Sequence, residues 1–313
     1  MRNKEKNFVS IIIYVHNAEN RILDFLKNLI ATLEENFEYS EIICVNDASV
    51  DNSLEQIKQV GLLAQTVSVS VVNMSYYHGL EISMNAGMDL AIGDFVFEFD
   101  NTILNFKEEE ILKVYKRALQ GYDIVSASPN IKERLTSSFF YKVFECFTDI
   151  PYNMKTESFR VLSRRAINRI SSMNKAIPYR KAAYENCGLK TDNIKYDVIE
   201  IRQGMKADKK EKRYRVGLAV DSLIMFTKVG YGFSVLMTAL MMFISIFMSI
   251  YSIIIYVTAH PVAGWTTMIL FLSVVFLGLF AILTVIIKYL QLLVDLVFKR
   301  KHYSFESIDK LTK

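Results

Sequence analysis

The stretch EIICVNDASVDNS, residues 41–53, contains an apolar run, a polar turn and the first residues of a helix. The run at residues 41–45 is short, apolar and partly β-branched, which is typical of a buried strand. The polar residues that follow break this pattern, and Asp51 and Asn52 are good helix N-caps. A helix over residues 52–61 comes next. The stretch therefore predicts a strand, a turn and a helix in direct succession.

The same alternation extends through the amino-terminal part of the chain. Further strands are predicted at residues 8–15, 67–72, 94–99 and 123–126, and further helices at residues 19–36, 79–91 and 108–119. Strands that alternate with helices of this length indicate an α/β fold with a largely parallel, Rossmann-like sheet. In such sheets, ligands bind beyond the carboxyl ends of the strands, where the strand order reverses.

Polar residues gather at three of these strand ends. They are Tyr14, His16, Asn17 and Glu19 after the first strand, Asn46, Asp47 and Ser49 after the second, and Asp100, Asn101 and Thr102 after the fourth. Each residue taken singly has a structural explanation as a helix cap or a turn former. Their convergence on one edge of the sheet instead favours a binding crevice.

Hydrophobicity is distributed unevenly along the chain, of which 51% is hydrophobic and 22% charged. Residues 232–257 and residues 265–287 contain no Lys, Arg, Asp or Glu. A helix needs about 20 apolar residues to cross a hydrocarbon core of roughly 30 Å. Both stretches exceed that length, so we predict two transmembrane helices. The alternative is a pair of buried core helices in a soluble protein.

Charged flanks predict the orientation of these helices. Seven Lys or Arg residues stand against two acids in residues 202–215, and three basic residues follow the second stretch at 299–301. The connecting loop, residues 258–264, has no charged residue apart from His260. Because basic residues favour the cytoplasmic side, we expect a multi-pass protein of the cell (plasma or inner) membrane with both termini in the cytoplasm.

Four regions follow from these patterns. They are an α/β domain at residues 1–205, a basic juxtamembrane and amphipathic helix at 206–231, a two-helix transmembrane hairpin at 232–287, and an interfacial helix with a cytoplasmic tail at 288–313. Polar residues recur at helical spacing in residues 288–299, which is typical of a helix in the headgroup plane. The same pattern fits a prolongation of the second span, and both readings stay open.

The composition as a whole excludes other classes of protein. A net charge of only +4 does not indicate a nucleic-acid partner. The three cysteines do not form a disulfide scaffold, and no two have metal-ligand spacing, so we expect reduced thiols in a cytoplasmic domain.

Several motifs occur in a fixed order along the chain. They are Asn17 and Glu19 after a first strand, Asn46-Asp47-Ala48-Ser49-Val50-Asp51, His78-Gly79, Asn85-Ala86-Gly87, Gly93-Asp94, Glu157-Ser158-Phe159-Arg160 with Arg164, and Lys212-Arg213-Tyr214 ahead of the first apolar stretch. This ordered set resembles family 2 glycosyltransferases of the GT-A fold, and more narrowly the dolichol-phosphate mannosyltransferase and bactoprenol glucosyltransferase branch. The resemblance covers nearly the whole chain.

The metal-binding motif of that branch is degenerate here. Its Asp-x-Asp signature holds a divalent ion, Mg²⁺ or Mn²⁺, on the nucleotide diphosphate. The first aspartate is Asp100, but the second position is Thr102, and Leu104 and Asn105 replace the glutamine and the third acid. Hard cations prefer carboxylate and water oxygens, and Leu104 offers none. The resemblance therefore implies a metal site at Asp100 with an incomplete ligand set, and we expect basic residues to take over part of its work.

The resemblance implies transfer of a sugar from a nucleotide sugar to a polyprenyl phosphate, with inversion, for cell-envelope or surface-glycan assembly. Because a phosphate monoester is already anionic near neutral pH, no strong general base is needed. The implied nucleotide-sugar residues are Asn17, Glu19, Asn46, Asp47 and Asp100. The implied catalytic residues are Asp100, Arg160 and Arg164, and Lys212, Arg213 and Arg215 would bind the acceptor phosphate.

A different class of function remains open. A catalytically silent relative could bind a nucleotide sugar or lipid and serve as a partner subunit. The turn at Asn46 and Asp47 and the retained Asp100 favour the enzyme, whereas Thr102 and Leu104 favour the silent relative. The resemblance also allows a homo-oligomer. For the basic residues near the first apolar stretch, attraction to anionic lipid is an equally good explanation.

Overall fold

The computed structural model describes residues 4–131, 156–173, 180–199 and 305–311, together with scattered helical positions between 236 and 293. The chain divides into two compact units. One unit contains residues 1–145, 150–218 and 301–313, and the other contains residues 146–149 and 219–300. The first unit carries all of the strands described below.

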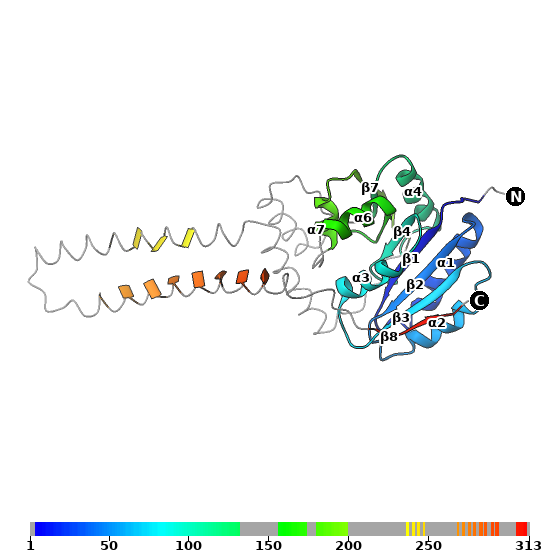
Figure 1. Ribbon diagram of the computed structural model, residues 1–313, viewed down its shortest axis with the longest axis horizontal. Coiled ribbons are helices and arrows are strands. Elements are labelled where there is room, and N and C mark those ends of the chain that lie inside the picture. The colour runs from blue at the N-terminus through cyan, green and yellow to red at the C-terminus, as the bar shows by residue number, and fades with distance from the viewer. Residues whose placement is uncertain are drawn as a thin grey trace, which may run out of the picture. The chain divides into compact units, whose positions relative to one another are not determined.

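An eight-stranded sheet runs through the first unit in the order β7-β5-β6-β4-β1-β2-β3-β8 (Figure 1). Its strands are β1 (Val9–Val15), β2 (Ser40–Asn46), β3 (Ser68–Met74), β4 (Phe95–Phe99), β5 (Ile124–Pro129), β6 (Phe159–Ser163), β7 (Thr191–Tyr196) and β8 (Phe305–Lys310). The four central strands, β4-β1-β2-β3, are parallel to one another. β6 and β8 are antiparallel to their neighbours. The expected α/β fold with a largely parallel sheet is confirmed.

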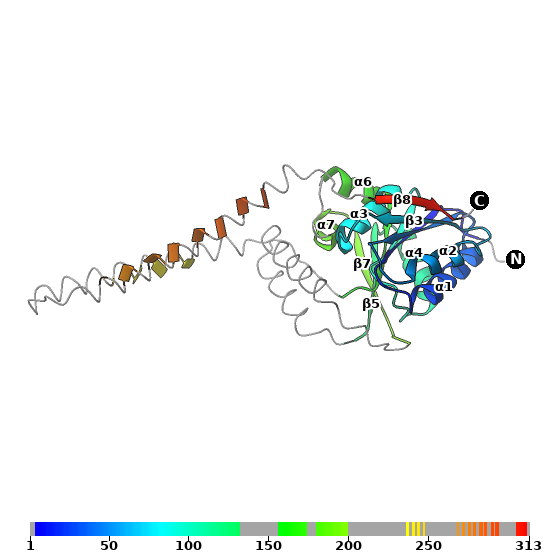
Figure 2. The same ribbon diagram turned by 90° about the horizontal axis from the view of Figure 1, so that it is seen from below.

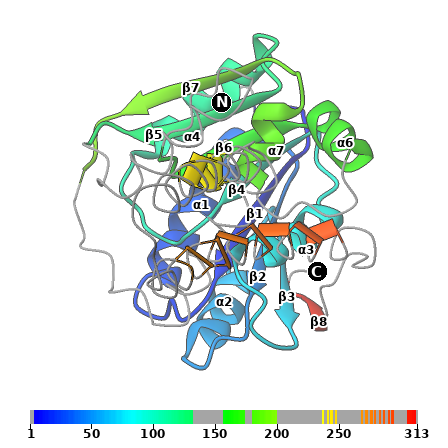
Figure 3. The same ribbon diagram turned by 90° about the vertical axis from the view of Figure 1, so that its left-hand side faces the viewer.

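Helices cover both faces of this sheet (Figure 3). They are α1 (Ile22–Asn36), α2 (Ser53–Gly61), α3 (Leu80–Leu90), α4 (Glu108–Leu119), α6 (Arg164–Met173) and α7 (Arg180–Asn186). Successive residues of β1 point to opposite faces, so Ile11 and Ile13 pack with α1, α2 and α4, whereas Ile12 packs with α3, α6 and α7. Two apolar layers therefore hold the sheet, which is why the central strands are apolar throughout.

The elements predicted up to residue 126 all occur, with ends that differ by a few residues. The region after residue 126 yielded no predicted elements of the α/β domain, yet it supplies β6, α6, α7 and β7. β6 inserts between β4 and β5 and is antiparallel to both. This insertion brings residues 159–163 beside β4, which ends at Phe99, directly before Asp100.

The last strand of the sheet comes from the carboxyl end of the chain. β8 pairs with β3 in antiparallel register, with Ser307 opposite Asn73 (Figure 2). Leu311 continues this contact, because its backbone N–H donates to the carbonyl of Val69 and its side chain lies against Gly61. Residues 305–311, which we predicted to lie in a tail separate from the α/β domain, therefore belong to the sheet of that domain.

The two predicted membrane spans, residues 232–257 and 265–287, lie mostly outside the described residues. Within the described part of the chain, no helix has the length and hydropathy that crossing a bilayer requires. Met241 and Gly278, one from each stretch, lie so close that a side chain at residue 278 would collide with the methionine. The predicted juxtamembrane helix at 206–231 falls outside the described residues altogether.

Candidate active site

The strand order of the sheet reverses at β1, which has β2 on one side and β4 on the other. All three strands are parallel, so their carboxyl ends meet at the same edge. Asn17, Asp47 and Asp100 follow these three ends. The structure thus brings together the three groups of polar residues that the sequence singled out, at the place where α/β sheets bind ligands.

Asp47 is fully buried, and its carboxylate is held by protein donors. The Tyr14 hydroxyl donates to Oδ2 at 2.9 Å, and the backbone N–H groups of His78 and Gly79 donate to Oδ1 and Oδ2, each at 2.8 Å. Burial and the neighbouring Asp47 carboxylate raise the pKa of Tyr14 well above its ordinary value, so this hydroxyl stays a donor. Asp47 therefore ties the end of β1 to the loop ahead of α3.

The loop after β1 and the loop after β2 interlock through reciprocal hydrogen bonds. The Asn17 N–H donates to Ser49 Oγ at 3.1 Å, and Asn17 Oδ1 accepts from the Val50 N–H at 3.0 Å. Glu19 Oε2 accepts from the Asn52 N–H at 3.1 Å. The predicted nucleotide-binding residues Asn17 and Glu19 thus shape one surface with the turn that contains Asp47.

Asn46 connects this turn to the far edge of the sheet. Its Nδ2 donates to Asn73 Oδ1 at 3.0 Å, and its Oδ1 accepts from the Ser49 N–H at 3.3 Å. Asn73 in turn donates from Nδ2 to Ser307 Oγ on β8 at 3.0 Å. A chain of amide contacts therefore joins the carboxyl-terminal strand to the turn after β2.

Aromatic rings lie beside the Asp47 corner. Tyr76 stacks on His78 with ring centroids 4.0 Å apart, and Tyr77 lies 4.8 Å from the ring of His16. The side chain of Tyr76 is exposed. These rings offer a flat surface to an aromatic ligand such as a nucleobase.

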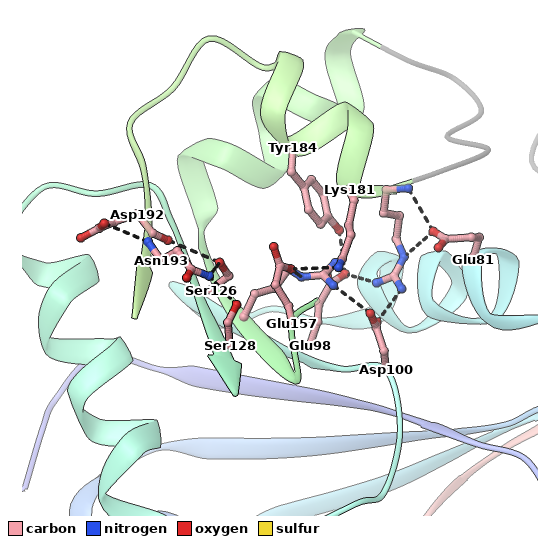
Figure 4. A network of polar contacts seen from close by, with 12 residues as sticks. Glu81, Glu98, Asp100, Ser126, Ser128, Glu157, Lys181, Tyr184, Asp192 and Asn193 are labelled. Carbon is pink, nitrogen blue, oxygen red and sulfur yellow. Dashed lines mark hydrogen bonds and ion pairs between the residues drawn. The ribbon is translucent and has the colours of Figure 1, made fainter. Parts of the chain in front are cut away.

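A second group of charged residues surrounds Asp100. Figure 4 shows Glu81, Glu98, Asp100 and Tyr184 converging from α3, β4 and α7. Arg180, at the start of α7, donates from Nε to Glu81 at 2.9 Å, from Nη1 to Glu98 at 2.6 Å and from Nη2 to Asp100 at 2.7 Å. Its side chain is only 1% exposed. One guanidinium group therefore bridges three carboxylates.

Arg160 on β6 makes a second, matching bridge. It donates from Nε to Glu157 at 3.0 Å, from Nη1 to Glu98 at 3.1 Å and from Nη2 to Asp100 at 2.8 Å. Its side chain is 2% exposed. The predicted role of Arg160 in catalysis is thus accompanied by ion pairs that occupy all three of its nitrogens. We call the residues joined by these two arginines the Asp100 cluster.

The charges in the Asp100 cluster nearly balance. Arg160, Arg180 and Lys181 contact the carboxylates of Glu81, Glu98, Asp100 and Glu157. Burial acts to raise the pKa of Asp100, but the two guanidinium groups outweigh it and hold that pKa well below its ordinary value. Burial also opposes the charge of each arginine, and the carboxylates overcome it, so the pKa of both arginines is raised. Asp100 and the two arginines therefore stay ionised, and basic side chains do not outnumber the acidic ones in the cluster.

The structure does not bring Arg164 to this group. Its guanidinium donates to the backbone carbonyls of Gly93 and Ala91, at 2.9 Å each, near the amino end of β4. Asp100 follows the opposite end of that strand. The resemblance implied a catalytic role for Arg164 together with Arg160, but β6 runs antiparallel to β4 and carries Arg164 away from Asp100. Lys212, Arg213 and Arg215 lie outside the described residues.

The residues around Asp100 do not fit a divalent metal ion. Each oxygen of Asp100 already accepts a guanidinium N–H. Thr102 is buried, Leu104 packs against the apolar core, and Asn105 Oδ1 accepts from the Tyr196 hydroxyl at 2.9 Å. Among the described residues, no group of three or more His, Cys, Asp or Glu side chains could hold a metal. The predicted Mg²⁺ or Mn²⁺ site at Asp100 therefore lacks a suitable ligand set.

Comparison with known proteins identifies the family. The model of glycosyl transferase family 2 matches residues 10–186, which is more than half of the chain. The chain belongs to glycosyl transferase family 2. Its sheet, with the 3-2-1-4 order of the parallel strands, is the GT-A fold that the sequence predicted.

Named relatives in this family differ in how much they share with the chain. An uncharacterized glycosyltransferase of Synechocystis is 28% identical over 195 residues, which is 60% of each chain. The uncharacterized glycosyltransferase YkcC of Bacillus subtilis is 25% identical over 91% of this chain and 89% of its own. An undecaprenyl-phosphate 4-deoxy-4-formamido-L-arabinose transferase of Aeromonas hydrophila is 30% identical over 125 residues, 40% of this chain and 38% of that one. The chain therefore spans less than two thirds of the length of several relatives.

Solved structures of other proteins share the fold. Mannosyl-3-phosphoglycerate synthase from Rubrobacter xylanophilus matches with a TM-score of 0.50 and 14% identity, over 69% of this chain and 74% of that one. Glucosyl-3-phosphoglycerate synthase from Mycobacterium tuberculosis, solved with Mn²⁺, UDP and phosphoglyceric acid, matches with a TM-score of 0.50 and 14% identity, over 70% and 78%.

Sequence reasoning missed four members of the Asp100 cluster in this family 2 protein. They are Glu81, Glu98, Arg180 and Lys181. Glu98 had a visible signal, because it is a lone acid inside the apolar strand FVFEF and a buried acid needs a partner. Arg180 had no such signal, because it lies 80 residues from Asp100 along the chain and only the fold brings the two residues together.

Proposed function

We propose that the protein transfers a sugar from a nucleotide sugar to a polyprenyl phosphate, with inversion at the anomeric carbon. One observation carries the proposal. The interlocked Asn17–Asp47 corner and the Asp100 cluster lie at the carboxyl ends of β1, β2 and β4, where the strand order reverses. A bound donor would lie across these ends, with its base near Tyr76 and its sugar toward Asp100.

The donor half of the proposal rests on the fold and on the polar corner. A structural neighbour of the same fold, the glucosyl-3-phosphoglycerate synthase above, was solved with UDP. In this chain, Asn17 and Glu19 join the loops after β1 and β2, and the buried Asp47 holds Tyr14 at the end of β1. A carboxylate has about four lone-pair sites. Two of the lone-pair sites of Asp100 accept hydrogen bonds from arginines, and its side chain is 19% exposed. It can therefore accept a further hydrogen bond from a hydroxyl of the donor.

The acceptor half of the proposal rests on relatives and on the apolar stretches. Several relatives, such as the one from Aeromonas hydrophila, are named for transfer to undecaprenyl phosphate. The uncharged residues 232–257 and 265–287 are long enough for two membrane spans, and basic residues precede them. We propose that Lys212, Arg213 and Arg215 bind the acceptor phosphate at the cytoplasmic face of the cell membrane. The product would serve cell-envelope or surface-glycan assembly.

The chemistry needs little from the protein beyond position and charge. An oxygen of the acceptor phosphate attacks the anomeric carbon, and the bond from that carbon to the nucleotide diphosphate breaks as the new bond forms. The acceptor is already ionised, so no residue has to remove a proton. The leaving diphosphate needs cations, and the Asp100 cluster offers no surplus. The basic residues ahead of the apolar stretches would supply them.

Transfer of labelled sugar tests this function. Purified full-length protein is mixed with undecaprenyl phosphate and a panel of nucleotide sugars, and label is counted in the lipid extract with and without chelator. We expect label from one donor, and we expect it to survive chelation. Asp100→Asn should reduce the label, whereas Arg165→Ala, which removes an arginine paired with Asp123 away from the site, should not. Folded protein that transfers no sugar from any donor would favour the silent partner subunit instead.

A further inference from the structure

Both oxygens of Asp100 are occupied from within the protein. Oδ1 accepts from Arg180 at 2.7 Å and Oδ2 accepts from Arg160 at 2.8 Å. Neither arginine can turn away easily, because the remaining nitrogens of each are bound to Glu98 and to one further carboxylate. The arrangement is therefore closed around Asp100, and a second cation would have to break it.

Arg180 is the cation on which three carboxylates converge. Its guanidinium contacts one oxygen from each of three carboxylates, on Glu81, Glu98 and Asp100. A hard divalent cation would need these oxygens drawn in to about 2–2.6 Å from one point, whereas here each oxygen accepts from a different nitrogen of a planar group. In this chain a fixed side chain with a charge of one pairs with the three carboxylates instead.

We propose that Arg180 takes the place of a divalent cation among Glu81, Glu98 and Asp100, so that this protein holds no metal ion on Asp100. Arg180 is then a positioning residue, which fixes the Asp100 carboxylate beside the bound donor. The inference rests on the proposed function for the meaning of the site, but it concerns metal binding and does not require that transfer be observed. It also explains how Thr102 and Leu104 are tolerated at positions where metal-binding relatives need polar ligands.

Electron paramagnetic resonance of Mn²⁺ tests the proposal directly, because bound and free Mn²⁺ give different spectra. The full-length chain is titrated with Mn²⁺ alone, then with Mn²⁺ in the presence of UDP or GDP. We expect that replacing Asp100 by asparagine leaves the spectra of the titration with Mn²⁺ alone unchanged. A bound Mn²⁺ signal that appears without nucleotide in the wild type and disappears in Asp100→Asn would overturn the proposal.

The variant Arg180→Ala provides the second arm. Removing the guanidinium leaves Glu81, Glu98 and Asp100 facing a vacated position, so we expect this variant to gain a bound Mn²⁺ signal. The double variant Arg180→Ala/Asp100→Asn should lose that signal, and Arg165→Ala, with the same loss of charge elsewhere, should never show it. A folded Arg180→Ala protein that binds no Mn²⁺ would refute the role of Arg180. If Arg180→Ala does not fold, the wild-type and Asp100→Asn titrations still decide the proposal.

The two possible failures are distinguishable. Absence of sugar transfer together with absence of Asp100-dependent Mn²⁺ binding would contradict the proposed function and leave the inference intact. Sugar transfer together with Mn²⁺ bound through Asp100 would do the opposite.

Discussion

The carboxylate of Asp47 accepts a 2.8 Å hydrogen bond from the backbone N–H of Gly79, which lies on a different loop, 32 residues further along the chain. Gly79 has a φ of 85°, a backbone conformation that glycine adopts at little cost. The contact fixes the loop ahead of α3, and that loop carries the aromatic rings beside the site. Asp47, which the sequence analysis assigned to ligand binding, thus holds the loop that borders the site.

Replacing Asp47 should therefore weaken nucleotide binding through the loop it holds. Asp47→Ala removes the acceptor of three buried hydrogen bonds, and we expect a loss of about 3 kcal/mol in the free energy of unfolding. Tyr14→Phe, which removes one of these bonds, should cost about 1 kcal/mol. Thermal unfolding measures both losses of stability, and calorimetric titration with UDP measures the affinity for the nucleotide. An unchanged affinity for UDP in Asp47→Ala would remove Asp47 from the site.

Ala48 offers a stabilising substitution. Its φ of 49° lies in the left-handed region, where a side chain costs roughly 1–2 kcal/mol. Glycine avoids that cost but gains freedom in the unfolded chain, so Ala48→Gly should raise the free energy of unfolding by about 0.5–1 kcal/mol. Ala118→Gly, inside α4, should lower it by about 1 kcal/mol. A decrease in both variants would contradict the assigned strain at Ala48.

Acid should remove the contribution of Asp100 to stability. The pKa of Asp100 is held below its ordinary value of about 3.9 in the folded protein, so its ionised form contributes stability above that pH. This contribution should fall away as the pH drops below about 4. Asp100→Asn lacks it at every pH, and we expect a deficit of about 2–3 kcal/mol at pH 7 that shrinks toward pH 3. Unfolding of the two proteins across this range measures the difference, and a constant deficit would argue against the ion pairs.

The amide chain from Ser307 to Asn46 predicts that β8 influences the donor site. Ser307→Ala removes the hydroxyl that orients Asn73, and we expect the affinity for UDP to fall about fivefold, which corresponds to ~1 kcal/mol. Ser172→Ala is the matched control, because that hydroxyl bonds the carbonyl of Arg169 on the exposed side of α6. Equal affinity in the two variants would show that the amide chain does not reach the site.

Much of the fold could be predicted because its signals are local. The apolar run at residues 41–45 and the caps that follow it determine a strand and a helix within 20 residues, and β2 and α2 occur there. The polar corner was predictable for the same reason, since parallel strands place their carboxyl ends together. Asn17 and Asp47 follow directly from that rule.

The rest depends on contacts between distant residues. β6 lies antiparallel between β4 and β5, and nothing in residues 159–163 indicates which strands they join. The direction of β6 decides that Arg160 faces Asp100 and that Arg164 does not. The partners of Asp100 were equally hidden, because an arginine near the start of a short helix looks the same whether it is exposed or buried.

The position of β8 determines when the sheet can be completed during synthesis. β3 is made with residues 68–74, but the strand that covers its outer edge emerges only after residue 304. Until then, β3 presents a row of unpaired N–H and C=O groups, and such an edge readily pairs with another chain. A chain shortened to the α/β domain at residue 205 would keep this edge open permanently, so recombinant work on that domain should supply residues 305–311 as a fused or added strand.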